Sequence, residues 1–231
     1  MRDVFASLIL TAVLLALSGC ARYPATAGGN TAPARTLVSE ITVLGEINPG
    51  YYYFLAIDTD GDTGDGPVPI VTGSELGNGW GTISGLGPND PIVEPPFYVM
   101  YHNGSFAMFR DGVYVGRPFR GEVSADRKTM LVEIDQLSLV APGAALPPTV
   151  QLNWITDEMI VTPPQLIGVR KQYDGFGPSG NTFLFDVPLT VTQTLESGVG
   201  VSPEELPRDT TSIDDIDMIH WRVEVRLQTA T

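Results

Sequence analysis

The clearest pattern along the chain is the alternation of apolar and polar residues over short stretches, which is typical of β-strands with one buried face. Four stretches show it most plainly, at residues 130–134, 150–154, 183–191 and 219–227. Tyr51 to Ile57 is apolar on both alternating faces, so we expect a central strand there. We expect Leu37 to Leu44 to be its neighbour, joined to it by the turn Asn48-Pro49-Gly50.

Turn signals separate the strands and indicate the fold class. Two hairpins are predicted, with turns at Asp111-Gly112 and at Ala125 to Lys128. A helix start is predicted only at Ser202 to Asp209, where Ser202 is followed by a proline and then by acidic residues. The chain contains 25 glycines and 19 prolines. The sequence therefore predicts an all-β protein, a two-sheet antiparallel β-sandwich with at most one short helix, with a closed barrel as the alternative.

The first nineteen residues have the layout of a secretory signal. Arg2 is followed by an apolar stretch from Val4 to Leu17 and then by the small residues Ser18 and Gly19. The residues at the end of this signal and the cysteine that follows it, Leu17-Ser18-Gly19-Cys20, resemble the bacterial lipobox. The resemblance implies that the signal is cut before Cys20 and that this cysteine carries a covalent lipid. Cys20 is also the single cysteine of the 231 residues, so no disulfide can form within the chain. A plain signal peptide is the alternative.

The remainder of the chain divides into two predicted parts. Residues 20–35 are a lipidated cysteine with a tether rich in Ala, Gly, Pro and Thr, and residues 36–231 are long enough and apolar enough for one β-rich ectodomain. The formal charge of −14 argues against nucleic acid and anionic lipid headgroups as partners and favours cations among small partners. The alternative is that the acidic surface serves solubility and has no specific cation function. Ala21 stands where an Asp often marks inner-membrane retention in lipoproteins resembling this one, which favours the outer membrane or cell surface.

A glycine-rich loop with alternating aspartates follows the strand expected at Tyr51 to Ile57. Oxygen ligands that converge from such a loop suit calcium, which takes six to eight of them. The candidate ligands are Asp58, Asp60, Asp62 and Asp65. The spacing opens like an EF-hand but departs from it at Thr63 and Pro69, where that motif requires Gly and Glu. The alternative is a solvated acidic turn, in which Asp and Gly serve turn geometry alone.

Three stretches together resemble the strands and loops of DOMON-type domains and of family-nine carbohydrate-binding modules. They are YYYFLAIDTDGDTGDGP, GEVSADRKTMLVEI and VQLNWITD. Members of these families are β-sandwiches that bind sugars, haem or other ligands, several with a calcium ion in a loop. The resemblance therefore implies a sandwich and favours the calcium interpretation, and no ligand-binding residue is carried over from it.

Aromatic residues in glycine-rich loops are the second class of candidate. Trp80 and the pair Tyr173 and Phe176 can present rings for stacking on a sugar or an apolar ligand. The alternative is that they cap the ends of the core. Trp154 and Trp221 fall on the apolar faces of their strands, and we interpret both as core residues.

Catalytic signals are weak. His102 lies in a predicted hairpin turn and His220 on the outward face of the last strand, and neither has a visible partner in the sequence. The acidic segment 204–217 is typical of a solvated loop or of a surface that contacts a partner. The leading hypothesis is a non-enzymatic, membrane-anchored envelope protein that binds a ligand such as a glycan. The alternatives are an assembly partner of another envelope protein and, third, a hydrolase.

Overall fold

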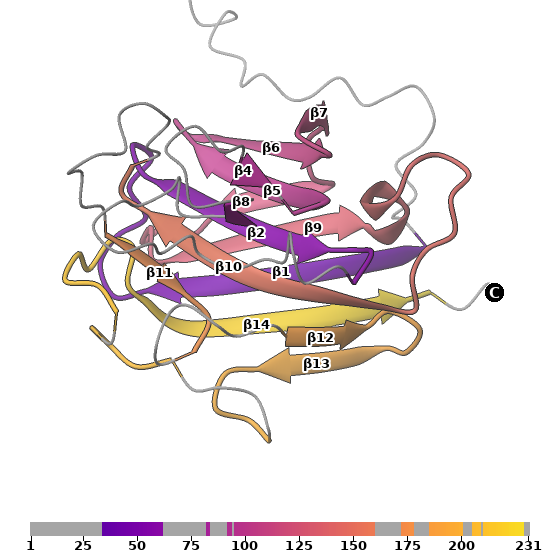
Figure 1. Cartoon of the computed structure of the whole chain (residues 1–231). Helices are drawn as coiled ribbons and strands as arrows, with labels where there is room; N and C mark the ends of the chain where they lie inside the picture. The colour runs from indigo at the N-terminus through magenta and orange to yellow at the C-terminus, as the bar shows by residue number, and fades with distance from the viewer. Residues whose placement is uncertain are drawn as a thin grey trace, which may run out of the picture. The chain divides into compact units, whose positions relative to one another are not determined.

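Alternating apolar residues form two antiparallel sheets in the computed structural model (Figure 1). It describes residues 34–61, 95–159, 172–177, 185–200, 205–208 and 210–228, and the backbone of 82–83 and 92–93. These residues belong to the compact unit that extends from Ala34 onward. None of the described residues forms a helix long and apolar enough to cross a membrane.

The first sheet contains five strands among the described residues. In spatial order they are β13 (Gln193–Glu196), β14 (Met218–Leu227), β1 (Arg35–Val43), β9 (Thr129–Asp135) and β8 (Arg120–Val123). The long strands β1 and β14 pair from Arg35 opposite Leu227 to Val43 opposite Met218. Trp221, Val223 and Val225 of β14 are buried, as the alternation predicts. The short 3-10 helix η1 (Gln136–Leu139) follows β9.

The second sheet contains seven strands within the described ranges. Along its main path they are β11 (Tyr173–Gly175), β10 (Thr149–Asp157), β2 (Tyr52–Asp58), β5 (Phe97–His102), β6 (Ser105–Arg110) and β7 (Val113–Gly116). The seventh strand, β12 (Phe185–Pro188), pairs with β10. The strands β3 (Thr82–Ile83) and β4 (Ile92–Val93) form a separate two-stranded pair.

The main core lies between the two sheets, so the fold is an open β-sandwich as predicted. Leu37 and Ile41 of β1 join Leu55 and Ile57 of β2 in one buried cluster. Trp154 and Trp221 are both buried there, which confirms their interpretation as core residues. The Trp154 indole Nε1 donates to the Ser39 hydroxyl at 2.7 Å and so links the two sheets by a buried hydrogen bond.

The strand β2 is buried on both faces, as its two-sided apolar pattern predicts. Its outward-facing residues Phe54 and Ala56 form a second cluster with Tyr98 and Ile155. The Phe54 ring meets the Tyr98 ring edge-on, with 6.2 Å between centroids. Both faces of the second sheet therefore carry apolar packing around β2.

The predicted hairpins form with the expected turn geometry. Asp111 and Gly112 have φ angles of 49° and 71°, the positive values that a tight two-residue turn requires, and they connect β6 to β7. Asn103 and Gly104, at φ 51° and 73°, connect β5 to β6 in the same way. The turn at 125–128 connects β8 to β9.

Two local predictions were wrong. Leu37 to Leu44 is not the neighbour of Tyr51 to Ile57, because β1 pairs with β14 and β9 whereas β2 pairs with β10 and β5 in the opposite sheet. The Asn48-Pro49-Gly50 segment therefore carries the chain from one sheet to the other. In the segment predicted to form a helix from Ser202, the described residues 205–208 are not helical and form a turn at 207–208, while Ser202 itself lies outside the described residues. Glu205 is buried, and its carboxylate accepts from Gly177 N–H.

Candidate functional site

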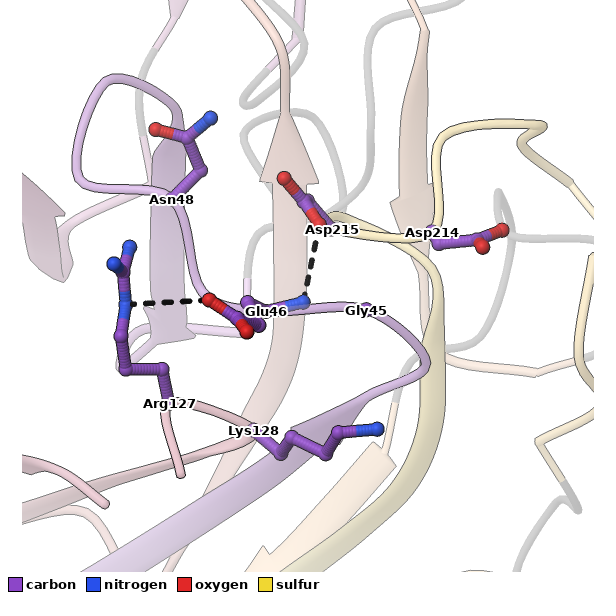
Figure 2. Close-up of a pocket in the computed structure, with 7 residues that line it drawn as sticks. All are labelled: Gly45, Glu46, Asn48, Arg127, Lys128, Asp214 and Asp215. Atoms are coloured by element: carbon purple, nitrogen blue, oxygen red, sulfur yellow. Dashed lines mark hydrogen bonds and ion pairs between the residues drawn. The ribbon is translucent and has the colours of Figure 1, made fainter. Parts of the chain in front are cut away.

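An open pocket of about 570 Å³ lies where three loops meet at one end of the sandwich (Figure 2). One loop connects β1 to β2, the second connects β8 to β9, and the third precedes β14. The lining residues are Gly45, Glu46, Asn48, Arg127, Lys128, Asp214 and Asp215. The volume lies in the range of small-ligand sites, but the walls are polar and charged where most such sites are apolar.

The β1–β2 loop is fixed against the loop before β14 by two backbone donors. Gly45 N–H donates to the Asp214 carbonyl at 2.7 Å, and Glu46 N–H donates to Asp215 Oδ1 at 3.0 Å. A Cβ atom at Gly45 would lie 2.4 Å from Asp215 Oδ1 and 2.8 Å from the Asp214 carbonyl carbon. Only glycine permits this approach, and it brings two carboxylates to the pocket wall.

The basic wall comes from the turn between β8 and β9. The Arg127 guanidinium donates to the Ile47 carbonyl at 2.7 Å, and its Nε lies 3.9 Å from Glu46 Oε2. The Lys128 ammonium donates to the Leu44 carbonyl at 3.2 Å. Both side chains are therefore held by backbone carbonyls of the facing loop, which positions their charges at the pocket (Figure 2).

The acidic wall is partly neutralised. Arg208 holds Asp214 through Nη2 and Nε, 3.0 Å and 3.1 Å from Oδ1. The buried hydroxyl of Tyr53 donates to the Asp215 carbonyl, and burial raises the pKa of that hydroxyl well above its usual value. The pocket thus presents donors on the wall formed by Arg127 and Lys128 and acceptors on the wall formed by Asp214 and Asp215, an arrangement that can hydrogen-bond a ligand rich in hydroxyl or amide groups.

Among the described members of the predicted calcium set, Asp58 has a buried carboxylate with an unpaired oxygen. Its side chain is only 1% exposed, and Oδ1 accepts from the backbone N–H groups of Asp60 and Gly61, each at 2.9 Å. Within the described structure no donor reaches its buried Oδ2. Burial raises the pKa of the Asp58 carboxyl, and the neighbouring Asp60 charge raises it further. A buried carboxylate oxygen without a donor is costly, so the site favours a proton or a cation.

A second orphan oxygen lies on the next strand. Gln151 of β10 is directly opposite Asp58 of β2, and on its other side it is opposite Asp186 of β12. Its Nε2 donates to Asp186 Oδ1 at 2.8 Å, while its buried Oε1 has no donor among the described residues. Opposite residues of an antiparallel pair point to the same face. Asp58, Gln151 and Asp186 therefore form a row of oxygen-bearing side chains across three strands, called the Asp58 row below.

Several predicted site residues lie outside the described ranges. Asp62, Asp65 and Trp80 are among them, as is Cys20 with the whole predicted signal and tether. The described His, Cys, Asp and Glu residues do not by themselves form a group of three that would hold a metal ion. Asp58 and Asp60 thus provide only part of the predicted calcium set.

The two described aromatic candidates do not belong to the Asp58 row. Tyr173 is opposite Asp157 on β10, six residues along that strand from Gln151 and roughly 20 Å away. Phe176 is buried and packs on Trp221 with 4.7 Å between ring centroids, which favours the alternative that it caps the core. Of the described candidates, Tyr173 and Phe176 are therefore not gathered with Asp58 into one site.

The pocket was missed in the sequence because its residues come from three distant segments. Of its residues, only Asp214 and Asp215 belong to a segment that the sequence singles out, the acidic stretch 204–217, which was predicted to be a solvated loop or a surface that contacts a partner. Both histidines have neighbours that the sequence did not reveal: the Tyr52 ring stacks on His102 with 3.9 Å between centroids, and His220 Nε2 lies 2.9 Å from Glu196 Oε1.

Comparison with known proteins adds no name to this geometry. No family model, curated protein or solved structure matches the chain. The likeness to DOMON-type and family-nine carbohydrate-binding domains stays a prediction. The pocket and the Asp58 row are therefore the features of the described structure that bear on function.

Proposed function

We propose that the protein is a non-catalytic binding protein of the bacterial cell envelope in which the Asp58 loop holds a calcium ion. In this proposal Cys20 carries the lipid that attaches the β-sandwich to the outer membrane or cell surface. The pocket beside Arg127 and Asp215 takes the ligand, a hydroxyl-rich molecule such as a glycan. The observation that carries the calcium part is the buried Asp58 carboxylate with its orphan Oδ2.

A calcium ion would satisfy the acceptor oxygens of the Asp58 row better than a neutral hydrogen-bond donor would. Asp58 Oδ2 and Gln151 Oε1 are two buried acceptors on facing residues, and the Asp60 carboxylate adds a like charge beside Asp58. A proton can serve one acceptor pair, whereas a calcium ion takes several oxygens and offsets the repulsion between carboxylates. Asp62 and Asp65, which follow in the sequence, are the proposed additional ligands.

The pocket supports the ligand-binding part by its size and its mixed polarity. Lys128 and Arg127 supply donors on one wall, and Asp215 and Glu46 supply acceptors on the other. Sugars are recognised by such pairs because each hydroxyl both donates and accepts. The pocket lies on loops that rigid strands position, which is a common arrangement for binding residues.

The calcium proposal is tested by titrating the purified full chain, in detergent, with calcium in a calorimeter while following its melting temperature. We expect saturable binding and a higher melting temperature, since a ligand at 100 times its dissociation constant stabilises the folded state by about 2.7 kcal/mol. Asp58→Asn and Asp60→Asn should abolish both effects, and Gln151→Met should weaken binding. Glu40→Gln, which removes one carboxylate from the other sheet, is the matched control. If the native chain showed neither heat of binding nor a change in melting temperature, the loop would be a solvated acidic turn that binds no calcium.

The ligand proposal is tested separately on an array of bacterial glycans. We expect binding by the native chain to be lost in Lys128→Gln and in Asp215→Asn, which each remove one charge from the pocket. The control is Arg222→Gln, since Arg222 is an exposed residue of β14 outside the pocket. Equal binding by all four proteins would show that the pocket is not the ligand site.

A further inference from the structure

The connection that carries the chain from η1 to β10 is exposed and uncharged. No charged residue occurs between Asp135 and Asp157. Residues 141–145, Ala-Pro-Gly-Ala-Ala, are all exposed, and the Leu137 side chain is 62% exposed. Residues 137–148 are called the apolar loop below. In a chain with a formal charge of −14, an exposed apolar stretch is typical of a surface that contacts a protein or a membrane.

The apolar loop lies at the end of the sandwich where β1 begins (Figure 1). Thr36 of β1 is opposite Asp135, the residue that precedes η1. Gln136 Nε2 donates to the Thr36 carbonyl at 3.2 Å, and Gln228 N–H donates to the Ala34 carbonyl at 2.8 Å. The chain therefore enters the first sheet beside the apolar loop, and this end of the sandwich is called the tether end.

Two further exposed apolar side chains lie at the tether end. Val191 is 50% exposed and follows β12, whose last residue Pro188 is opposite Thr149 at the start of β10. Phe119 is 49% exposed and precedes β8, which starts opposite the last residues of β9. Three separate connections thus place exposed apolar side chains around one end.

The opposite end of the sandwich is charged. The pocket residues Gly45 and Glu46 follow the far end of β1, and Arg127 and Lys128 precede the far end of β9. The nine residues of β1 separate the two ends by about 30 Å. The tether end and the pocket end therefore differ in polarity and are well separated.

The chain that precedes β1 indicates what the tether end contacts. In the proposed function Cys20 carries a lipid, and only residues 21–34 separate it from β1. A flexible chain of that length has an r.m.s. span of about 20 Å, so the tether end stays close to the bilayer. Tethering raises the effective concentration of the apolar loop at the membrane, so that even a weak contact forms.

We infer that the apolar loop lies in the interface of the bilayer that holds the lipid anchor, with Leu137 toward the acyl chains. This inference rests on the lipid anchor of the proposed function. An uncharged loop enters the interface without the cost of burying a charge. The domain is then oriented with its pocket away from the membrane, where the pocket is open to ligands.

The charged residues near the apolar loop indicate which lipids suit it. The Arg110 guanidinium donates to the Ser138 carbonyl and lines a separate cavity of about 400 Å³ beside the loop. Its Nε has no hydrogen-bond acceptor among the described residues. A guanidinium attracts the phosphate of a headgroup. Asp135, which also lines this cavity, repels anionic headgroups, so zwitterionic phospholipids suit the tether end best.

Quenching by brominated lipids tests the contact in the full chain. The intact mass of the protein purified from bacterial membranes shows whether Cys20 carries a lipid. If Cys20 is a free thiol, it is coupled to a maleimide lipid, so that the chain is anchored in either case. The vesicles contain phosphatidylethanolamine and phosphatidylcholine with brominated acyl chains.

Two variants report on the two ends of the domain. Leu137→Trp places a tryptophan on the apolar loop. Val199→Trp places one at a residue that is 60% exposed and follows the end of β13 farther from the tether end. The native chain gives the background of its own three tryptophans. We expect the added emission of Leu137→Trp to be quenched several-fold more than that of Val199→Trp.

A charge placed on the apolar loop should weaken the contact. Adding Ala141→Asp to Leu137→Trp should lower the quenching several-fold, whereas adding Val199→Asp should not. Melting curves verify that each variant is folded. Equal quenching of Leu137→Trp and Val199→Trp in a chain that carries its lipid would overturn this inference and leave the anchor intact. An unmodified Cys20 would instead refute the anchor, and quenching in the coupled chain would still decide whether the loop contacts lipid.

Discussion

The Tyr53 hydroxyl donates a 2.8 Å hydrogen bond to the backbone carbonyl of Asp215. The same hydroxyl accepts from Asn48 N–H at 2.9 Å. One buried group on β2 thus ties the β1–β2 loop to the loop that precedes β14. The positions of Asn48 and Asp215 at the pocket are therefore set from inside the sandwich.

Tyr53→Phe should destabilise the fold by about 1 to 3 kcal/mol, because it leaves a backbone donor and a backbone acceptor without their partner. Urea denaturation measures the change. Tyr114→Phe, which removes a hydroxyl from an exposed ring, should shift the midpoint little. Equal midpoints for Tyr53→Phe and the native chain would show that water replaces the bridge without loss.

Gly45→Ala should destabilise the protein by roughly 1 to 3 kcal/mol, the usual range for overpacking. The new Cβ would meet the Asp214 and Asp215 backbone within 3 Å, so the loops must separate. Thermal denaturation is the measurement. Gly50→Ala is the matched control, since its Cβ would meet only Asn48 Oδ1, at 3.3 Å. A smaller loss for Gly45→Ala than for Gly50→Ala would contradict the close approach.

Ser39→Ala should cost about 1 to 3 kcal/mol because the buried Trp154 Nε1 donor loses its acceptor. Combining it with Trp154→Phe should cost less than the sum of the two single changes, since each removes the same hydrogen bond. Chemical denaturation of the four proteins gives the coupling. Strict additivity would mean that the two residues do not share an energetically significant bond.

The raised pKa of Asp58 gives a pH dependence of stability with a definite sign. Between the ordinary aspartate pKa of about 3.9 and the raised folded value, the folded state holds a proton that the unfolded state has lost, so stability falls as pH rises. With a chelator present, the native chain should lose stability relative to Asp58→Asn from about pH 4 upward. Denaturant midpoints of the two proteins across that pH range measure the difference. If the native chain became more stable relative to Asp58→Asn as the pH rises, the Asp58 pKa would not be raised.

The strands were predictable because burial of one face imposes a period of two on the sequence, as in β14 and β9. The hairpin at Asp111-Gly112 was predictable because few residues tolerate positive φ. The partner of β1 was not, since alternation says which face is buried and nothing about which strand lies alongside. Both β1 and β2 are central strands, but in different sheets.

The candidate sites show the same division. Asp58 was found because a local cluster of aspartates follows a strand. Gln151 and Asp186 were not, because only strand register brings Gln151 opposite Asp58 on one side and Asp186 on the other. The pocket residues Glu46, Arg127 and Asp215 are likewise joined by tertiary contacts that leave no local pattern. Sites that form through contacts between distant segments therefore cannot be predicted from local sequence patterns.

The pairing of β1 with β14 has a consequence for the order of folding. The first long strand of the sandwich has the last one as its neighbour, and Gln228 N–H donates to the Ala34 carbonyl at 2.8 Å beyond their ends. Closing so large a loop costs chain entropy before any contact returns it, and non-local strand pairing is slow for that reason. The first sheet therefore cannot be completed until residues 218–227 have been synthesised, and until then the edge of β1 that faces β14 has no partner strand, even where β9 has already paired with its other edge.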